Sequence, residues 1–430
     1  MNFIMTPDRI TPPEIQPMPM LHMPPAIVTE TPSGATVYRY SGGDAPATRI
    51  SISIEGGLAG IATPEIGALL APLWIEGTRD MDAETIADFI DYRGAWINTD
   101  MGIRTMNLTV NALNHNFDEI LPVLSGIVSA PTFPDDRLRQ VALRTAAAVG
   151  VERSTTAWNA SAALRAMVYG DGHPLRRETD ADLLCDVTSQ QLHDVYFSHL
   201  HPANIKAFIS GRLSDATLGE VTAMLNSIPA TGTPEKVTVP EFRPSASRRT
   251  HITMPNAQQS AVRMGLLLPG RENPDFVAIR LLVLALGGYF GSRLMLNVRE
   301  DKGYTYGINA VTIGYPHQAY MSISAEADAA YVEPLIAETI SEMERMKDES
   351  SYTADEIDRL RRLSLSGLAA MLDTPFTIMD HHRSSVLAGA PSDYFARQQE
   401  AIYNLSAESL AELARRYFDT SALFIATAGV

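Results

Sequence analysis

The feature of this sequence that most constrains its fold is one order of predicted elements that occurs twice. Each half shows two strand-like segments, two helical segments, two more strands, a helical stretch and a closing strand. The predicted strands are TVYRY, RISISIEGG, INTDMG, RTMNLTVNAL and NIKAFISG, then HITMP, AVRMGLLLPG, YTYGINAVTIG, AYMSISAEA and LFIATAG. The repeat predicts an α+β fold of two duplicated domains, each a mostly antiparallel sheet with helices packed on one face.

The domain boundaries follow from changes in composition along the chain. Residues 1–25 are rich in Pro and Met and lack periodicity, so we expect an N-terminal arm packed on the body. The segment 229–247 contains four prolines and little apolar periodicity, which is typical of a linker. The predicted domains are therefore 26–228 and 248–430. Helices are predicted at 64–76, 83–93, 115–129, 134–150, 155–200, 274–286, 292–301, 329–347 and 353–371.

Composition excludes several classes of partner. With 430 residues and 45% hydrophobic content, the chain can bury large cores. Its formal charge of −16 argues against nucleic acid or an anionic membrane as a partner, because both attract basic surfaces. The N-terminus has no secretory signal and no apolar run is long enough to span a bilayer, so we expect a cytoplasmic protein, or a periplasmic one if a leader was trimmed.

No self-sufficient catalytic motif is present in the sequence. Phosphate-binding loops, dinucleotide fingerprints and nucleophile elbows are missing. The pairs His199/His201 and His381/His382 lack the spacing of metal ligands on a helix. Cys185 stands beside aspartates, whose charge disfavours a reactive thiolate, so we expect it to be structural. A hydrolase that uses Cys185 or a histidine pair stays open as a third option.

The most informative stretch is LGGYFGSRLMLNVREDKGYTYGI, residues 286–308. A turn at Gly287 and Gly288 ends one helix, and Ser292 is a candidate N-cap for the next. That second helix is predicted to end near residue 299, and a strand follows after a tight turn.

Two side chains of this stretch carry donors suited to acyl chemistry. Arg299 falls at the helix C-terminus and Tyr306 in the strand that follows, so both can lie on one side of a cleft. A guanidinium and a phenol can hold a peptide carbonyl and stabilise an oxyanion. Spacing alone favours the structural alternative, in which Arg299 complements the helix dipole and Tyr306 packs on the sheet. We expect the adjacent Tyr304 to serve packing.

The stretch resembles the LGGGxSSRLFxxxRExxGLxYxV segment of the pitrilysin/insulinase family of zinc metallopeptidases, which includes the mitochondrial processing peptidases. The Gly-Gly turn, Ser-Arg-Leu, Val-Arg-Glu, Gly303 and Tyr306 fall in register. RISISIEGG resembles the strand before the family's zinc helix, GAWINTDMG its GGxxNAxT turn, HPLRRE its HPxGRP segment and HPANIKAFISG its TPxNMxLxVxG strand. The resemblance covers almost the whole chain and implies a fold like that of the mitochondrial processing peptidases.

In that family the zinc helix carries HxxEH followed by a Gly-Thr turn. Counted back from the Gly-Thr of EIGALLAPLWIEGT, the histidine positions hold Ala68 and Pro72, and the glutamate position holds Ala71. A third ligand position falls near Leu138. None of these side chains can bind zinc or activate its water, and Pro72 also removes a backbone donor from the expected helix. We therefore expect no metal and no other cofactor in this chain.

The resemblance implies a non-catalytic subunit of a heterodimeric zinc metallopeptidase. In two-chain members of the family, one subunit supplies HxxEH and zinc, and the other supplies the Arg/Tyr pair. Arg299 would hold a peptide substrate, with Gly287 and Gly288 beside it, and Tyr306 would stabilise the tetrahedral intermediate. The isolated chain would not be an enzyme, but with a homologous HxxEH-bearing partner it would be part of one. The alternative is a structural or peptide-binding pseudo-peptidase scaffold with no part in hydrolysis.

Overall fold

The computed structural model describes residues 11, 18–212 and 214–430. Most of the predicted N-terminal arm, at 1–10 and 12–17, lies outside the described residues. In the part that follows, the Leu21 N–H donates to Gln399 Oε1 over 2.7 Å. The Pro24 carbonyl lies 2.7 Å from His382 Nε2. This part of the arm therefore packs on the C-terminal half of the chain.

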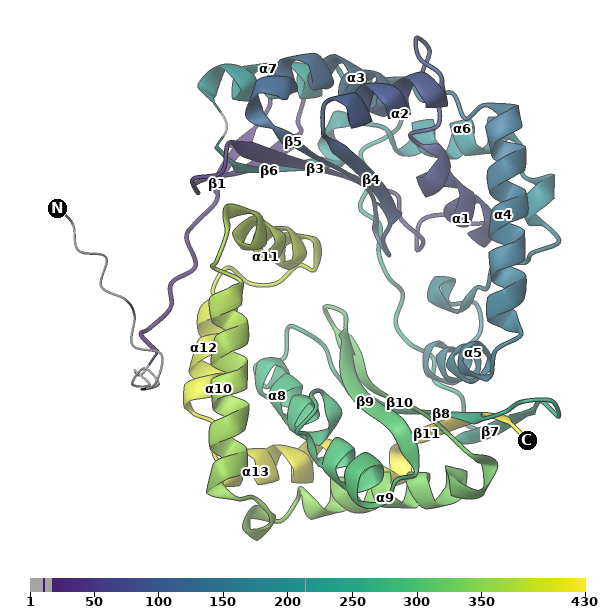
Figure 1. Ribbon diagram of the computed structural model, residues 1–430, viewed down its shortest axis with the longest axis vertical. Coiled ribbons are helices and arrows are strands. Elements are labelled where there is room, and N and C mark those ends of the chain that lie inside the picture. Colours follow the sequence, from purple (N-terminus) through teal and green to yellow (C-terminus); the bar gives the residue numbers. More distant parts are fainter. Residues whose placement is uncertain (1–10, 12–17, 213) are drawn as a thin grey trace.

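The N-terminal half forms a six-stranded sheet with helices on its outer face (Figure 1). Its strands are β1 (Ile27–Glu30), β2 (Thr36–Ser41), β3 (Ala47–Glu55), β4 (Trp96–Met101), β5 (Thr105–Leu113) and β6 (Ile205–Gly211). Its helices are α1 (Pro64–Leu73), α2 (Ala83–Tyr92), α3 (Phe117–Ser129), α4 (Asp135–Arg153), α5 (Thr156–Tyr169), α6 (Ser189–His199) and α7 (Asp215–Ser227). In β3, Ile50, Ile52 and Ile54 are fully buried and alternate with polar residues, so one sheet face is apolar and the other polar.

The C-terminal half repeats this arrangement with a five-stranded sheet. Its strands are β7 (Arg249–Thr253), β8 (Ser260–Pro269), β9 (Thr305–Gly314), β10 (Gln318–Ala327) and β11 (Phe424–Gly429). Its helices are α8 (Phe276–Gly287), the π-helix η5 (Met295–Asp301), α9 (Val332–Arg345), α10 (Ala354–Ala370), α11 (Pro375–Leu387), α12 (Tyr394–Tyr403) and α13 (Ala407–Tyr417).

The strand order confirms the predicted fold class. The order β2-β6-β3-β5-β4 in the first sheet corresponds strand by strand to β7-β11-β8-β10-β9 in the second. In each sheet one pair is parallel, β2 with β6 and β7 with β11, and the other neighbours are antiparallel. The first sheet has β1 as an additional edge strand. The chain is thus an α+β protein with a duplicated sheet.

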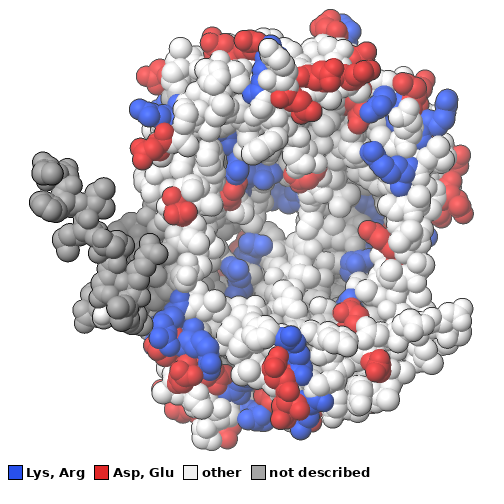
Figure 2. Space-filling view, viewed as in Figure 1, with Lys and Arg blue, Asp and Glu red and all other residues white. Residues whose placement is uncertain are grey.

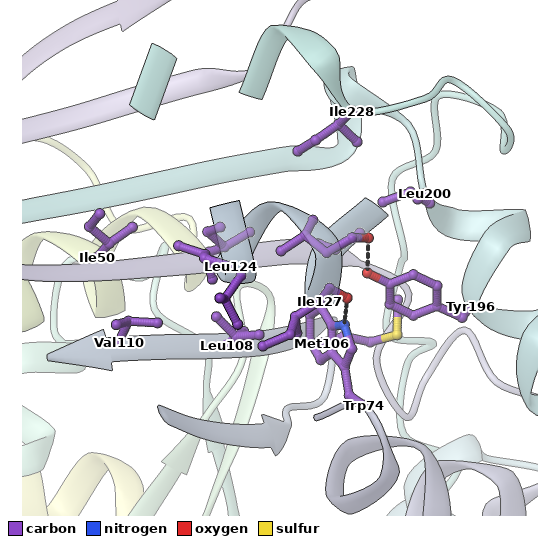
Figure 3. Packing of buried hydrophobic residues seen from close by; sticks show 14 of the residues in the cluster. Ile50, Trp74, Met106, Leu108, Val110, Leu124, Ile127, Tyr196, Leu200 and Ile228 are labelled. Atoms are coloured by element: carbon purple, nitrogen blue, oxygen red, sulfur yellow. Dashed lines mark hydrogen bonds between the residues drawn. The ribbon is translucent and has the colours of Figure 1, made fainter. Parts of the chain in front are cut away.

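Two aromatic side chains in the core of the first half form hydrogen bonds with the end of α3 (Figure 3). The Trp74 indole N–H donates to the Ile127 carbonyl over 3.0 Å, and the Tyr196 hydroxyl donates to the Val128 carbonyl over 2.7 Å. These carbonyls belong to the last turn of α3 and have no partner within the helix. Both rings can therefore be fully buried without leaving a polar atom unpaired.

Each half also covers the inner face of the other half's sheet (Figure 1). From the N-terminal half, α5 packs on β8 and β11, and its Leu164 and Val168 share a buried cluster with Tyr320 and Phe424. From the C-terminal half, α11 packs on β2 and β6. In space, each of these two helices therefore lies on the half opposite to the predicted domain that contains it in the sequence.

The segment between the halves is fixed along the body of the molecule. Residues 230–248 contain no helix or strand. The Val237 N–H donates to Glu55 Oε2 at 3.3 Å in the first half, and the Phe242 N–H donates to Gln318 Oε1 at 2.7 Å in the second. The linker therefore contacts both halves.

Several element predictions were wrong in detail. Instead of one helical run at 155–200 there are two helices, α5 and α6, separated by loops and short 3₁₀ turns. Helices α7, α11, α12 and α13 and strand β1 were not predicted. The predicted helix 64–76 ends at Leu73. No helix in the described part of the chain combines the length and hydropathy needed to cross a bilayer.

Candidate functional site

Helix α1 contains the positions that the resemblance assigns to the zinc helix, and it presents apolar side chains there. Ala71 is buried, and Ala68 packs against the core of the first half. Leu138 of α4, the helix that packs beside α1, belongs to the same core. These positions carry no atom that ligates zinc, so the residues do not fit the metal site of the peptidases that the sequence resembles. Among the described residues, no group of three or more His, Cys, Asp or Glu side chains is arranged to hold a metal ion.

Pro72 lies at the end of α1 and not in its interior. The helix stops one residue later, and the chain continues with two short i→i−3 bonds, from the Trp74 N–H to the Ala71 carbonyl and from the Glu76 N–H to the Leu73 carbonyl. The Ala71 carbonyl also accepts from Thr99 Oγ1 of β4 at 2.7 Å. Pro72 therefore costs one hydrogen bond in a last turn, which is a smaller loss than a proline in mid-helix.

The Gly-Gly turn permits α8 to end directly against β9. A Cβ atom at Gly287 would lie 2.7 Å from the Ala310 Cβ, and one at Gly288 would lie 2.7 Å from a methyl group of Leu284. Packing alone thus requires small residues at both positions. The substrate contact expected for Gly287 and Gly288 stays a prediction.

Arg293, just before the helix that carries Arg299, is held by several buried contacts. Its guanidinium donates to both carboxylate oxygens of Glu356, at 2.7 and 3.0 Å, and to the Ser351 carbonyl. It also lies 4.0 Å above the Tyr352 ring. Burial acts to lower the pKa of Arg293, but the pairing with Glu356 raises it above its ordinary value. This buried pair fixes the start of the helix that carries Arg299.

The helix that carries Arg299 is a π-helix, which the sequence did not indicate. The Lys302 N–H donates to the Asn297 carbonyl over 2.9 Å, a five-residue step. The Tyr304 N–H then donates to the Val298 carbonyl at 3.0 Å, which ties this helix to the start of β9. Ser292 does not cap the helix as predicted, because its buried hydroxyl has no hydrogen-bond partner among the described residues. π-helical turns are frequent at functional sites.

Arg299 is half-buried beside an exposed aromatic ring. Its guanidinium carbon lies 4.7 Å from the centre of the Phe290 ring, and Nη1 lies 3.1 Å from Glu300 Oε1. Phe290 itself is 66% exposed. The cation–π contact orients the Arg299 side chain at the surface without burying its donors.

The structural alternative requires Tyr306 to pack on the sheet, but its side chain does not. Its side chain is 89% exposed, and its hydroxyl has no hydrogen bond with the described residues. Tyr304, by contrast, stacks on Tyr331 with ring centres 5.0 Å apart, as expected for a packing residue. No hydrogen bond among the described residues joins Arg299 to Tyr306, although their two elements are neighbours. Both therefore present donors at the surface.

Of the remaining sequence candidates, His199 and His201 have hydrogen-bond partners. His199 is buried and its Nδ1 lies 3.0 Å from Glu235 Oε2. His201 Nδ1 accepts from the Ala203 N–H, as a cap of the next turn. Burial lowers the pKa of His381, and the charges of its neighbours His382 and Arg280 act in the same direction. Cys185 is exposed.

Sequence comparisons identify related proteins. The family profile described as "Peptidase M16 inactive domain" matches residues 186–364. A Bacillus subtilis protein named "Uncharacterized zinc protease YmxG" is 24% identical over 335 residues, which are 76% of this chain and 79% of the relative. The Helicobacter pylori "Non-peptidase homolog YmxG" is 23% identical over 251 residues, which are 56% of each chain.

Solved structures share the whole architecture. The peptidase M16 inactive domain from Pseudomonas fluorescens matches with a TM-score of 0.84 and 22% identity, over 94% of this chain and 98% of that one. A chain of complex III2 from Candida albicans matches with a TM-score of 0.73 and 13% identity, over 94% and 95%. Fold and motif together resemble those of the M16 peptidases and their inactive homologues, and the inactive-domain profile matches part of this chain. This confirms the resemblance to the pitrilysin/insulinase family; within the class, the profile that matches is that of the inactive domain.

Proposed function

We propose that the chain is the non-catalytic subunit of a heterodimeric zinc metallopeptidase, in which Arg299 and Tyr306 act on a peptide at the partner's zinc. The observation that carries the proposal is the contrast between two parts of the same chain. The metal-site positions on α1 and α4 carry no side chain that can bind zinc, whereas η5 and β9 retain two donors, Arg299 half-buried and Tyr306 exposed. The partner would be a homologous chain with HxxEH intact.

The chemistry of the two side chains suits this role. A phenol O–H can donate to the oxyanion of a tetrahedral intermediate, and a guanidinium can hold a neighbouring carbonyl of the substrate. The buried Arg293–Glu356 pair supports this part of the chain. Such support matters because oxyanion donors are effective only when they are already in place.

Two edge strands offer main-chain groups for an extended peptide. β4 is the last strand of the first sheet and β9 that of the second, so one edge of each is free of partners within the described chain. Trp96 of β4 is 71% exposed. An added strand would be recognised through its backbone and would impose little sequence preference.

The proposal is tested with a co-expressed HxxEH-bearing relative from the same genome. We expect the pair to cleave an unfolded polypeptide, and Tyr306→Phe or Arg299→Ala to lower kcat about 10²–10³-fold. Tyr304→Phe is the matched control, because Tyr304 is engaged in stacking, and it should retain the wild-type rate. Unchanged rates in both Arg299→Ala and Tyr306→Phe would refute the shared-site mechanism.

A second candidate is a scaffold without a part in hydrolysis. The observation that favours it is the similarity to a chain of complex III2, an assembly in which that relative is found. The same co-expression experiment separates the two functions. A scaffold would form a stable assembly in which the partner's hydrolysis does not depend on this chain.

A further inference from the structure

A cavity of about 230 Å³ lies where the two halves meet. Ile103 and Arg104, from the hairpin between β4 and β5, line one side. The linker contributes Val239, the turn between β9 and β10 contributes Tyr315, and the end of α11 contributes Leu387. None of the lining residues belongs to the 286–308 motif. The cavity is therefore separate from the proposed site of hydrolysis.

The cavity is lined by two arginines and by no Asp or Glu. Arg104 is satisfied, because its Nη2 lies 3.1 Å from Glu55 Oε1 and its Nε donates to the Val237 carbonyl at 2.9 Å. Glu55 also pairs with Lys206 at 3.5 Å, so the cluster of Arg104, Lys206 and Glu55 keeps a net positive charge. The second arginine, Arg271, has no carboxylate partner in the described part of the chain.

Arg271 uses only one of its side-chain nitrogens. Its Nε donates to the Gly314 carbonyl over 3.0 Å, and its backbone N–H donates to the Tyr315 carbonyl at 2.8 Å. Its two terminal amino groups form no hydrogen bond with any described residue. Burial lowers the pKa of the Arg271 guanidinium; nearby Tyr394 opposes this shift, and the charge of Arg280 adds to it. A half-buried cation without a counter-charge is costly, and an anion would remove that cost.

The surroundings indicate what kind of anion fits. Figure 2 shows Lys and Arg side chains gathered around the hollow at the middle of this face, although the chain carries a net charge of −16. The forked guanidinium matches a carboxylate, and the remaining walls of the cavity are largely apolar. Its volume is below the roughly 300–1,000 Å³ of typical small-molecule sites, so it suits one amino-acid residue better than a cofactor.

We propose that this cavity binds the C-terminal residue of a peptide, with the carboxylate on the free amino groups of Arg271 and an apolar side chain against Ile103 and Leu387. The inference rests on the proposed function, since it names the end of the peptide that the chain would hold. A C-terminal carboxylate fits better than an acidic side chain, because it brings its own apolar side chain to the apolar walls.

The test uses the full chain without a partner subunit and three fluorescent peptides of equal length. One ends in leucine with a free carboxylate, one is its C-terminal amide, and one is an amide with an internal glutamate. We expect the free acid to bind at least tenfold more tightly than either amide in an anisotropy titration. Arg271→Gln should abolish that preference, and Arg280→Gln, at an exposed arginine outside the cavity lining, should retain it.

Each other result overturns the inference. Equal binding of acid and amide by the wild-type chain excludes a carboxylate site, and this comparison needs no variant that must fold. Equal binding of the free acid and the internal-glutamate peptide excludes the C-terminal assignment, and binding of none of them excludes the site. A failure of the hydrolysis experiment with Tyr306→Phe would leave the acid-over-amide preference untouched, so the two proposals fail separately.

Discussion

Arg263 of β8 donates from Nε to Ser161 Oγ of α5 over 3.0 Å, although 102 residues separate them and α5 belongs to the other half of the chain. The same relationship occurs on the corresponding strand of the first sheet. There Arg49 of β3 lies 2.8 Å from Asp380 of α11. Each half contributes one helix that packs on the sheet of the other half, so neither sheet is fully covered by its own half. We therefore expect the two halves to fold and unfold as one unit.

This exchange predicts that a core change in α5 destabilises the whole molecule. Leu164 is 3% exposed and packs on the second sheet, so Leu164→Ala should lower the free energy of unfolding by about 2–5 kcal/mol. Calorimetry should still show one transition, shifted to lower temperature. Leu143→Ala, at a 58% exposed leucine of α4, is the control and should have little effect. Two resolved transitions would contradict the exchange as a source of cooperativity.

A second prediction concerns the close approach of α8 to β9. Gly287→Ala places a methyl group 2.7 Å from the Ala310 Cβ and 3.0 Å from its backbone nitrogen, and should cost about 1–3 kcal/mol. Gly307→Ala in the same motif meets no atom within 4 Å and should be nearly neutral. Urea unfolding of the two variants measures the difference. Equal stabilities would show that the helix end can move away at no cost.

The buried pair under the motif gives a third prediction. Arg293→Ala leaves Glu356 without its bidentate partner, and such breaking of a buried pair costs about 3–5 kcal/mol. Arg359→Ala, which removes an exposed pair with Asp355, should cost less than about 1 kcal/mol. Thermal unfolding compares the variants. If Arg293→Ala lost no more stability than Arg359→Ala, the Arg293–Glu356 pair would not be what holds the motif in place.

The pH dependence of stability follows from a histidine at the junction of the halves. His173 Nδ1 accepts from the Leu175 N–H and its Nε2 lies 3.1 Å from the Pro240 carbonyl, an arrangement that suits the neutral ring. Burial lowers the pKa of His173; the Pro240 contact opposes this shift, and the charge of Arg177 adds to it. The unfolded chain, with a pKa of about 6.5, therefore binds more protons in this window. The contribution of neutral His173 to the free energy of unfolding is fully present above about pH 6.5. It is lost as the pH falls towards the lower pKa of His173 in the folded chain.

Urea titrations at pH 7.5 and pH 5.5 check this sign. The wild-type chain should lose stability at the lower pH, and His173→Gln should lose less over the same interval. His381, whose pKa is also lowered, contributes in the same direction in both proteins. Identical pH dependence in the wild type and the variant would contradict the assignment.

Most of the candidate site was accessible from the sequence because its signals are local. The Gly-Gly turn, Arg299 and Tyr306 lie within one short stretch, and the positions of the HxxEH motif lie within one helix. The exposure of Tyr306 was not accessible, since a strand residue can face either the core or solvent according to what covers the sheet. Nor was the π-helix, because one short π-helical segment leaves no periodic pattern in the sequence.

The sequence by itself determined the duplicated order of strands and helices, because the periods of 2 and 3.6 are properties of each segment alone. It also determined the absence of zinc-ligating side chains on α1. Only the tertiary structure decided that α5 and α11 each cover the sheet of the opposite half. It also decided that Arg271 lines a cavity that has no Asp or Glu in its wall. A hydrophobic helix face shows that something must be buried against it, but the partner is chosen by packing between residues far apart in the chain.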